Sequence, residues 1–238
     1  MPPLRSYIDP FQDVPSGFDS TFNPYLEKVK EDAKASVPRV LYGPYLRGKK
    51  SHWLDWFHHS RSMLPTAQGK LIVEIGSHDG AVMCSLAAKS PHHCFVGLDI
   101  TLKRVHKAAM LAKEQGLANV AFAYANARAM SHLFAAEEIH SILIFFPDPW
   151  QKKMRQRKHR LLDASFCKVL YGLLQPKGSL WFKTDAQEYF LSSDDLFKKV
   201  GFITETHNKN LSGDCISTFE KRFRAQNKKI FQQHYQKL

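Results

Sequence analysis

The chain has 238 residues, with 34 Lys or Arg against 22 Asp or Glu, so its formal net charge at pH 7 is +12. This length suits one α/β domain with additional segments, and the 44% of apolar residues excludes an intrinsically disordered chain. The excess of positive charge favours an acidic partner, which is a nucleic acid, an anionic membrane or a phosphorylated substrate. A generally basic set of proteins in the source cell is the alternative explanation.

The sequence contains no segment with the length and hydropathy of a membrane span. Its longest strongly apolar stretch, residues 139–147, is far shorter than the roughly 20 residues that a spanning helix needs. Residues 1–17 contain four prolines and no apolar core, so we expect no signal peptide. The four cysteines include no C-x-x-C pair, which indicates free thiols in a reducing compartment. We therefore predict a cytoplasmic protein that does not contact membranes.

Residues 1–65 differ in composition from the rest, because they hold eight of the twelve prolines together with many aromatic residues. Proline interrupts regular elements and aromatic side chains favour burial, so we predict an irregular N-terminal arm packed on a main domain of residues 66–238. A short helix is expected from Tyr25 to Ala35, since Pro24 suits a helix start. We expect the aromatic side chains to pack in the core rather than to stack on bases.

From residue 70 onward, short apolar runs alternate with amphipathic segments. This alternation predicts right-handed βαβ units and a doubly wound, mostly parallel sheet, in which ligands bind beyond the carboxyl ends of the strands. Thr101 is expected to cap the second of the helices. The expected strands are 71–75, 94–98, 120–125, 139–146 and 179–184, with a strand-like 202–206, and the expected helices are 81–89, 101–115, 160–174 and 186–200.

The first strand leads into a turn, Gly76-Ser-His-Asp-Gly80, that resembles a nucleotide-binding turn. The two glycines permit a tight bend and the close approach of a ligand, and Asp99 ends the next strand, where a carboxylate can accept both ribose hydroxyls. Glu74 is placed to orient the amino group of a methionine moiety. Ser77 and His78 interrupt the G-x-G-x-x-G pattern, which disfavours a nicotinamide-dependent oxidoreductase. The alternative is an ordinary βα turn with solvated strand ends.

The fourth strand ends in the most specific motif of the chain, Phe145-Phe-Pro-Asp-Pro-Trp150. Two prolines bracket Asp148 and block helix formation, so this carboxylate projects rigidly from a strand end. Residues 152–160 follow with six Lys or Arg and no acid, which favours a phosphate-binding track beside Asp148. A solvated surface run is the alternative. The basic residues that we expect at the RNA backbone are Lys153, Arg155, Arg157 and Lys158.

Three other polar positions carry weaker signals. Asn126, after the third strand, suits either an adenine edge or a helix N-cap. Asp185, after the fifth strand, suits a helix N-cap, and Glu220 in the tail suits a surface ion pair. His58 and His59 lack a matching Cys/His spacing, so we predict no metal site.

Taken together, these residues resemble the bacterial tRNA (guanine-N7)-methyltransferase family. The resemblance runs from about Leu71 to Arg222 and rests on three segments that follow the E-I-G turn: F-P-D-P-W, T-D-x-x-x-Y at 184–189, and S-T-F-E-x-R at 217–222. It implies a Rossmann-like fold of the S-adenosylmethionine-dependent methyltransferase type. It also implies transfer of a methyl group from S-adenosylmethionine to N7 of guanine 46 in the variable loop of tRNA.

The resemblance also implies roles for individual residues. Asp148 is the central catalytic carboxylate, close to both cofactor and base. The sequence departs from the family at Ser77-His78, where more glycine is usual, at Gln151, at one additional residue near Met154, and at Ser217. The implied cofactor-binding residues are Glu74, Gly76, Asp99, Asn126 and Asp148, and the implied substrate-binding residues are Lys152, Asp185, Ser217, Thr218 and Glu220.

The implied reaction sets simple chemical requirements. Guanine N7 carries a lone pair and no proton, so the transfer needs alignment and a carboxylate near the purine that becomes cationic, but no general base. We expect Asp148 to orient the guanine. Two alternatives stay open: a methyltransferase acting on another RNA or on protein, and a non-catalytic RNA-binding relative. The sequence is compatible with a monomer or a homodimer.

Overall fold

The structure is a computed structural model that describes residues 24–34, 39–42, 53–61, 69–150, 154–205 and 216–238. These residues form an eight-stranded sheet in the order β1-β4-β3-β2-β5-β6-β8-β7. β1 to β6 pair in parallel, and β8 pairs antiparallel with both β6 and β7. The strands are β1 (Val40–Leu41), β2 (Leu71–Ile75), β3 (Cys94–Asp99), β4 (Val120–Tyr124), β5 (Ile139–Phe145), β6 (Leu174–Thr184), β7 (Phe202–Glu205) and β8 (Phe231–Lys237).

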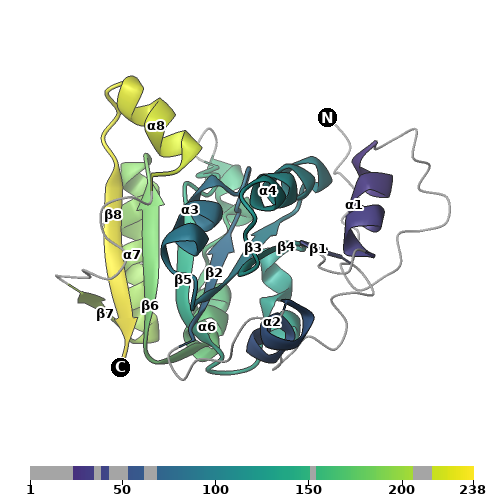
Figure 1. Cartoon of the computed structure of the whole chain (residues 1–238). Coiled ribbons are helices and arrows are strands. Elements are labelled where there is room, and N and C mark those ends of the chain that lie inside the picture. The colour runs from purple at the N-terminus through teal and green to yellow at the C-terminus, as the bar shows by residue number, and fades with distance from the viewer. Residues whose placement is uncertain (1–23, 35–38, 43–52, 62–68, 151–153, 206–215) are drawn as a thin grey trace.

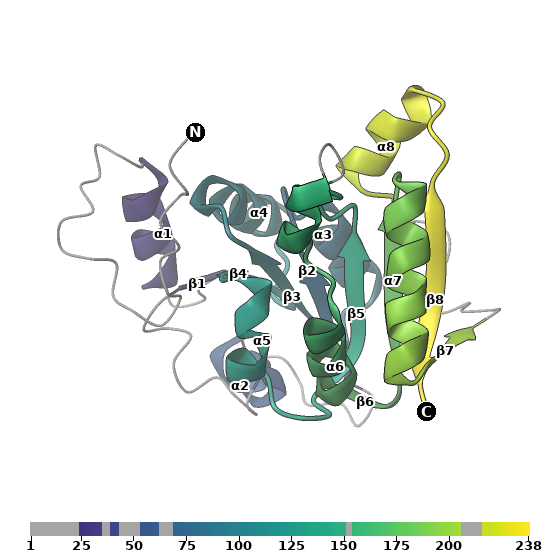
Figure 2. The same ribbon diagram turned by 180° about the vertical axis from the view of Figure 1, so that it is seen from behind.

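Helices cover both faces of the sheet, which confirms the predicted doubly wound fold (Figures 1 and 2). On one face, α1 (Tyr25–Ala33), α3 (Ala81–Lys89) and α4 (Leu102–Glu114) enclose one apolar core. On the other face, α2 (Trp53–Arg61), α5 (Met130–Leu133), α6 (Ala164–Leu173) and α7 (Gln187–Val200) enclose a second core. The short 3-10 helices η2 (Ala127–Ala129) and η3 (Met154–His159) and the helix α8 (Thr218–Ala225) complete these elements.

The helix ends follow local side-chain chemistry. α6 begins at Ala164, four residues later than predicted, because the side chain of Asp163 accepts a hydrogen bond from the Phe166 N–H at 2.8 Å and caps the helix. Thr101 does occupy the N-cap of α4, but its side chain makes no capping hydrogen bond, so that detail of the prediction is wrong. The buried face of α4 is the predicted one, with Val105, Ala108, Ala109 and Ala112 fully enclosed.

The described part of the N-terminal region packs against the main domain. α1 starts at Tyr25 as predicted, and its Asp32 accepts hydrogen bonds from the backbone N–H groups of Arg39 and Val40, which lead into the unpredicted strand β1. Trp53 is completely buried and donates from its indole Nε1 to the Leu133 carbonyl at 2.7 Å, so the predicted core packing is confirmed for it. The boundary at residue 65 stays a prediction, because residues 62–68 lie outside the described ranges.

The C-terminal part departs most from the prediction. Strand β7 occupies the strand-like segment, but α8 and β8 were not predicted, and β8 is inserted between β6 and β7 (Figure 1). α8 buries only Glu220 among its described residues, and β8 completely buries only Tyr235. β8 therefore has no continuous apolar pattern, and the apolar face of α8 is limited to Phe219 and Phe223, which pack against His78 and Phe146.

The strand order places a topological switch point between β2 and β5, since the chain proceeds from β2 outward through β3 and β4 and then returns to β5 and β6. Ligands bind at such a point, beyond the carboxyl ends of the strands. α8 lies at this same end of the sheet (Figures 1 and 2). None of the described helices is long and apolar enough to cross a membrane.

Candidate active site

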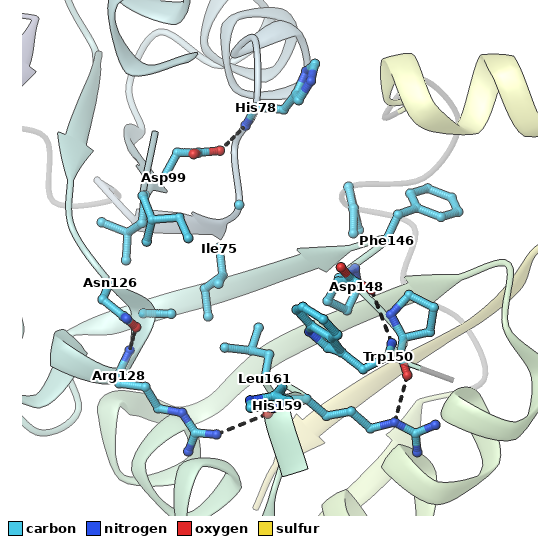
Figure 3. Close-up of a pocket in the computed structure, with 18 of the residues that line it drawn as sticks. Ile75, His78, Asp99, Asn126, Arg128, Phe146, Asp148, Trp150, His159 and Leu161 are labelled. Carbon is cyan, nitrogen blue, oxygen red and sulfur yellow. Dashed lines mark hydrogen bonds between the residues drawn. The ribbon is translucent and has the colours of Figure 1, made fainter. Parts of the chain in front are cut away.

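A cleft of about 660 Å³ opens at the switch point, and it brings together five of the predicted residues: Gly76, Asp99, Asn126, Asp148 and Lys158. Asp99 and Asn126 lie on one side, and Asp148 lies beside Trp150 on the other (Figure 3). Gly76 lines the cleft between them and also lines a smaller recess of about 20 Å³, to which Glu74 contributes. Residues far apart in the sequence therefore meet at one end of the sheet.

The turn after β2 is shaped by its two glycines, both in the left-handed region, with φ of 78° at Gly76 and 75° at Gly80. A Cβ on Gly80 would lie 2.6 Å from the Cβ of Ala108 and 2.7 Å from the Phe122 ring, so this position needs glycine for close packing as well as for conformation. A Cβ on Gly76 would meet no atom within 4 Å. Gly80 therefore allows the turn to pack closely against α4, whereas Gly76 leaves space next to the cleft.

Asp99 is a buried carboxylate that the backbone holds in place. Its oxygens accept hydrogen bonds from the N–H groups of His78 at 3.1 Å and Thr101 at 2.9 Å, and Arg104 lies 3.8 Å away. Burial raises the pKa of Asp99, and the Arg104 guanidinium opposes that rise. A fixed acceptor at the end of β3 suits a ligand hydroxyl pair.

Glu74 is the most perturbed acid of the site. Its side chain is only 3% exposed, and burial raises its pKa to about 8, helped by the nearby carboxylates of Asp79 and Asp99 and opposed by Lys183. Among the described residues, no donor reaches its Oε2 atom. A buried acceptor without a partner is costly, so this atom is suited to a donor carried by a ligand.

Asp148 lies in an exposed loop whose two ends are conformationally strained. Phe146 has a φ of 53° and Trp150 a φ of 43°, both in the left-handed region that non-glycine residues rarely adopt. The N–H of Trp150 donates to Asp148 Oδ1 at 3.2 Å, and the N–H of Phe146 donates to the Lys183 carbonyl at 2.8 Å. The carboxylate is thus oriented by its own loop while remaining accessible from the cleft.

Asn126 adopts the capping role that was one of its two predicted alternatives. Its Oδ1 accepts from the N–H of Arg128 at 2.9 Å and caps η2. The Arg128 guanidinium in turn donates to the Arg160 carbonyl at 3.2 Å and pairs with Asp163 at 2.7 Å. The side chain of Asn126 still lines the cleft.

The start of α8 contacts the turn that follows β2. Thr218 Oγ1 donates to Asp79 Oδ2 at 2.9 Å, and the rings of Phe219 and His78 meet edge to face with centroids 4.8 Å apart. Ser217 caps the helix by accepting from the Glu220 N–H at 3.1 Å. The residues implied for substrate binding therefore adjoin the turn implied for the cofactor.

Glu220 is an ion-pair residue, but the expectation of a surface pair is wrong. It is completely buried, and its carboxylate accepts from Lys183 Nζ at 2.8 Å and from the guanidinium of Arg224. A carboxylate in an enclosed position must be paired in this way, because an isolated buried charge is strongly unfavourable. The pair fastens α8 to β6.

Asp185 does not cap a helix, so that alternative is also wrong. The N-cap of α7 is Ala186, without a side-chain capping bond, and Asp185 instead accepts from Lys228 Nζ at 3.0 Å. Of the expected basic track, Arg157 and Lys158 are exposed, and Lys158 lines the cleft. The other basic residues predicted at the RNA fall outside what the structure describes: Lys152, Lys153 and the side chain of Arg155.

Two cations that organise the site, Arg160 and Lys183, were not predicted from the sequence. Arg160 stood out only as part of the basic run, and Lys183 only as part of a strand, yet both are buried. Lys183 lies 4.8 Å from the ring centroid of Phe145 and 4.2 Å from that of Trp181, in addition to its pair with Glu220. The one available signal was that Lys183 directly follows the apolar run Leu180-Trp-Phe182, since a lysine that is buried in a strand requires a partner.

The family model Methyltransf_4, described as "Putative methyltransferase", matches residues 68–233, which include every element that lines the cleft. The chain belongs to this methyltransferase family. One solved structure with a related fold is an antibiotic-related methyltransferase, with a TM-score of 0.56 and 17% identity over 77% of this chain and 94% of that chain. Another is the 16S rRNA methyltransferase KamB, with a TM-score of 0.53 and 14% identity over 74% of this chain and 89% of that chain. These likenesses support the Rossmann-like methyltransferase fold.

Curated relatives of this methyltransferase carry more specific names. The tRNA (guanine-N(7)-)-methyltransferase of Streptococcus mutans is 29% identical over 76% of this chain and 84% of the relative, and that of Geobacillus kaustophilus is 28% identical over 84% and 90%. A bifunctional glycosyltransferase/methyltransferase of Fusobacterium nucleatum is 28% identical over 86% of this chain. The chain spans 31% of the length of that bifunctional relative.

Proposed function

We propose that this methyltransferase transfers a methyl group from S-adenosylmethionine to N7 of guanine in tRNA, at position 46 of the variable loop. One observation carries the proposal: a cleft at the switch point has buried carboxylates on one side and the exposed Asp148 on the other. The names of the relatives support the tRNA substrate.

The cofactor side fits S-adenosylmethionine residue by residue. Glu74 Oε2 has no donor within the described structure and is suited to the ligand's ammonium group. Asp99 is held where it can accept from ribose hydroxyls, and the space at Gly76 admits a ligand close to the backbone. Asn126 lines the cleft, and we assign it to the adenine edge. When bound, this cofactor supplies a methyl group that its sulfonium charge has already activated.

Asp148 is suited to orient the base rather than to remove a proton. Guanine offers its N1–H and its exocyclic amine as donors to a carboxylate, which distinguishes it from adenine. Because N7 has no proton to lose, the contribution of the enzyme is alignment of the two reactants, which is worth up to roughly 7–11 kcal/mol. The negative charge of Asp148 also stabilises the purine as it becomes cationic.

The outer surface of the cleft suits an RNA. N7 lies on the major-groove edge, which is deep and narrow in A-form RNA, so the guanine must be reached in an irregular or opened region at a cost of about a few kcal/mol. Arg157 and Lys158 offer phosphate contacts at the rim, and the indole of Trp150, 38% exposed, offers a stacking surface. These contacts would offset the cost of unstacking.

The remaining substrate-side residues have two proposed roles, either direct contact with the RNA or support of the residues that contact it. We assign Thr218 and Asp185 to direct contact with the RNA, where each would exchange its present protein partner. Glu220 is enclosed, so we assign it a supporting role: it holds the start of α8 through Lys183. Ser217 holds the same turn as its N-cap.

A methylation assay tests the proposal directly. The purified protein is incubated with labelled S-adenosylmethionine and a tRNA transcript that carries G46, and the digested nucleosides are identified by mass spectrometry. We expect 7-methylguanosine with G46 and none with a matched transcript that carries A46. A different methylated nucleoside would favour a methyltransferase with another target. The absence of both methylation and thermal stabilisation by the cofactor would favour a non-catalytic RNA-binding relative.

A further inference from the structure

The side chain of Arg160 is enclosed between the Asp148 loop, defined as residues 146–150, and helix α7. Only 9% of Arg160 is exposed, and its Nε donates to the Pro149 carbonyl at 2.9 Å. Its two terminal nitrogens form a fork on the carboxylate of Glu188, and one of them also reaches Ser192 Oγ at 3.4 Å. The guanidinium carbon lies 4.7 Å from the ring centroid of Tyr189. One side chain thus joins the loop to three residues of α7.

We propose that Arg160 is a positioning residue that holds the Asp148 loop in its reactive conformation by anchoring the Pro149 carbonyl to α7. It acts through the loop and does not itself contact the reacting atoms. This inference rests on the proposed methyl transfer, in which Asp148 aligns the base. It assigns Arg160 a role separate from that of the neighbouring basic residues.

The Asp148 loop requires such an anchor because its conformation is intrinsically unfavourable. Phe146 and Trp150, at its two ends, are both non-glycine residues with positive φ. Pro147 and Pro149 have no N–H group, so neither can be fastened by donating a backbone hydrogen bond. At the Phe146 end, the backbone is fastened to Lys183 of β6. At the Pro149 end, the corresponding attachment is the donor from Arg160.

The geometry distinguishes Arg160 from a phosphate-binding residue. Its Nε–H and both terminal nitrogens have protein acceptors, and the hydrogen bond from Arg160 holds the pKa of Glu188 below its usual value, so this partner stays ionised at neutral pH. In contrast, the side chain of Arg157 is 48% exposed, although its Nη1 also lies 3.6 Å from Glu188 Oε1. Among the described side chains of the basic segment, Arg160 is therefore the internal anchor, whereas Arg157 and Lys158 are exposed.

The backbone of Arg160 extends the connection to the opposite side of the cleft. Its carbonyl accepts from Arg128, which follows the Asn126 cap on the cofactor side (Figure 3). Movement of Arg160 would therefore displace the Asp148 loop relative to the cofactor-side wall. Small misplacements of reacting groups are costly, since about 1 Å can reduce a rate roughly 100-fold.

The test compares R160A and R160K with the wild type and with K199A. Lys199 is a matched control because it also forms an ion pair on α7, with Asp195, but is 70% exposed and has no described contact with the loop. Single-turnover methylation is measured at saturating cofactor and tRNA, at a temperature at which circular dichroism shows each variant folded. We expect R160A to lose about 30- to 100-fold in rate, while both dissociation constants stay within about threefold.

R160K should recover part of the rate, because an ammonium group can reach the Pro149 carbonyl or Glu188 but cannot form the fork while it does so. E188Q, which retains Arg160, should lose less than R160A and serves as a second variant if R160A does not fold. K199A should match the wild type. A wild-type rate in R160A, or a loss confined to tRNA affinity, would overturn the inference.

Hydrogen exchange gives a readout that does not depend on methylation. We expect the peptide that contains residues 145–150 to exchange faster in R160A and R160K than in K199A or the wild type. Unchanged exchange would overturn the positioning role whatever the substrate is. Failure of the wild type to form 7-methylguanosine, combined with faster exchange in R160A, would instead refute the proposed function and retain the anchor.

Discussion

Both sides of the cleft carry carboxylates, but these carboxylates differ in how far they are buried. On the proposed cofactor side, Glu74 and Asp99 are 3% and 4% exposed, and both have raised pKa values because they are buried. On the proposed substrate side, Asp148 is exposed. A small cationic cofactor can be enclosed by a preformed dry site, whereas a large RNA must reach its carboxylate from outside and exclude water as it binds.

The two sides also differ in what holds them. Backbone N–H groups of the first turn and of the segment after β3 fix Asp99. On the other side, a side chain from a separate segment, Arg160, reaches the Asp148 loop. The backbone hydrogen bonds to Asp99 are local and form whenever the turn forms. The contact between Arg160 and the Asp148 loop depends instead on packing between distant elements. The substrate side should therefore be easier to disable by single substitutions without loss of the fold.

The largest effect is expected at Asp148. The D148A substitution should reduce single-turnover methylation by about 10²- to 10³-fold, because it removes a charge placed near the purine that becomes cationic. Cofactor affinity, measured by calorimetry, should change far less. D148N is the matched control, since it retains an acceptor of the same size without the charge and should lose less activity. An equal loss of rate and cofactor affinity would place Asp148 on the cofactor side and remove the contrast between the two walls.

The next largest effect concerns stability of the cofactor side. G80A should destabilise the protein by about 3 kcal/mol, because the new Cβ would be forced against Ala108 and Phe122 at a positive φ. G76A has the same unfavourable conformation but open space around it, so it should cost only about 1 kcal/mol. Urea unfolding of the two variants measures the difference. Equal destabilisation would show that packing against α4 does not set the turn.

The pH dependence of cofactor binding should reveal the buried acid. Glu74, with a pKa of about 8, is mostly protonated in the free protein below that pH, and a cationic ligand favours its ionised form. Binding then releases a proton, so affinity should rise with pH from about 6 to 8, by at most about tenfold per unit. E74Q should flatten this profile, and calorimetry in buffers with different ionisation enthalpies measures the proton released. A flat wild-type profile would contradict the assignment.

The same group makes an opposite prediction for the free protein. Between its ordinary value of 4.5 and about 8, the folded state retains a proton on Glu74 that the unfolded state has lost. The free energy of unfolding should therefore fall as pH rises through this window and level off above it. E74Q lacks that dependence, so its stability relative to the wild type should improve from pH 5 to 8 in chemical denaturation. A constant difference between the two would count against a protonated Glu74.

The smallest effect is expected at the exposed rim. Replacing Arg157 and Lys158 together by Ala should weaken tRNA binding only several-fold and should reduce the slope of log K against log salt by about one for each phosphate that is no longer neutralised. Filter binding across a range of salt concentrations measures both, with K199A as the control for removal of one surface charge. An unchanged slope would show that Arg157 and Lys158 do not contact the phosphates of the tRNA.

The parts of the site that lie at strand ends could be predicted from the sequence, because parallel strands bring their carboxyl ends to the same edge. Asp99, Asn126 and Asp148 were placed near one another on this basis, and the structure brings them to one cleft. The doubly wound sheet followed from the alternation of apolar runs and amphipathic segments. These inferences need only local periodicity and one topological rule.

What could not be predicted depends on contacts between distant or weakly patterned segments. Arg160 meets Glu188 across 28 residues, and nothing in a run of basic residues marks which one turns inward. α8 and β8 were missed because their buried residues are few and include charged side chains, Glu220 and Lys237. Such side chains become interior only when their partners, Lys183 and Glu137, are brought to them.

The position of β8 has a consequence for the order in which the protein is made. Residues 231–237 leave the ribosome after β7, but they pair between β6 and β7. Until they are synthesised, β6 has an open edge and β7 has no neighbour in the sheet, while β2 to β5 already have their partners. α8 lies between β7 and β8 in the sequence, and its Glu220 pairs with Lys183 of β6, which is made earlier. The strands that carry Glu74 and Asp99 and the strand that leads to Asp148 can therefore pair on a nascent chain, and the β6-β8-β7 edge of the sheet is completed last.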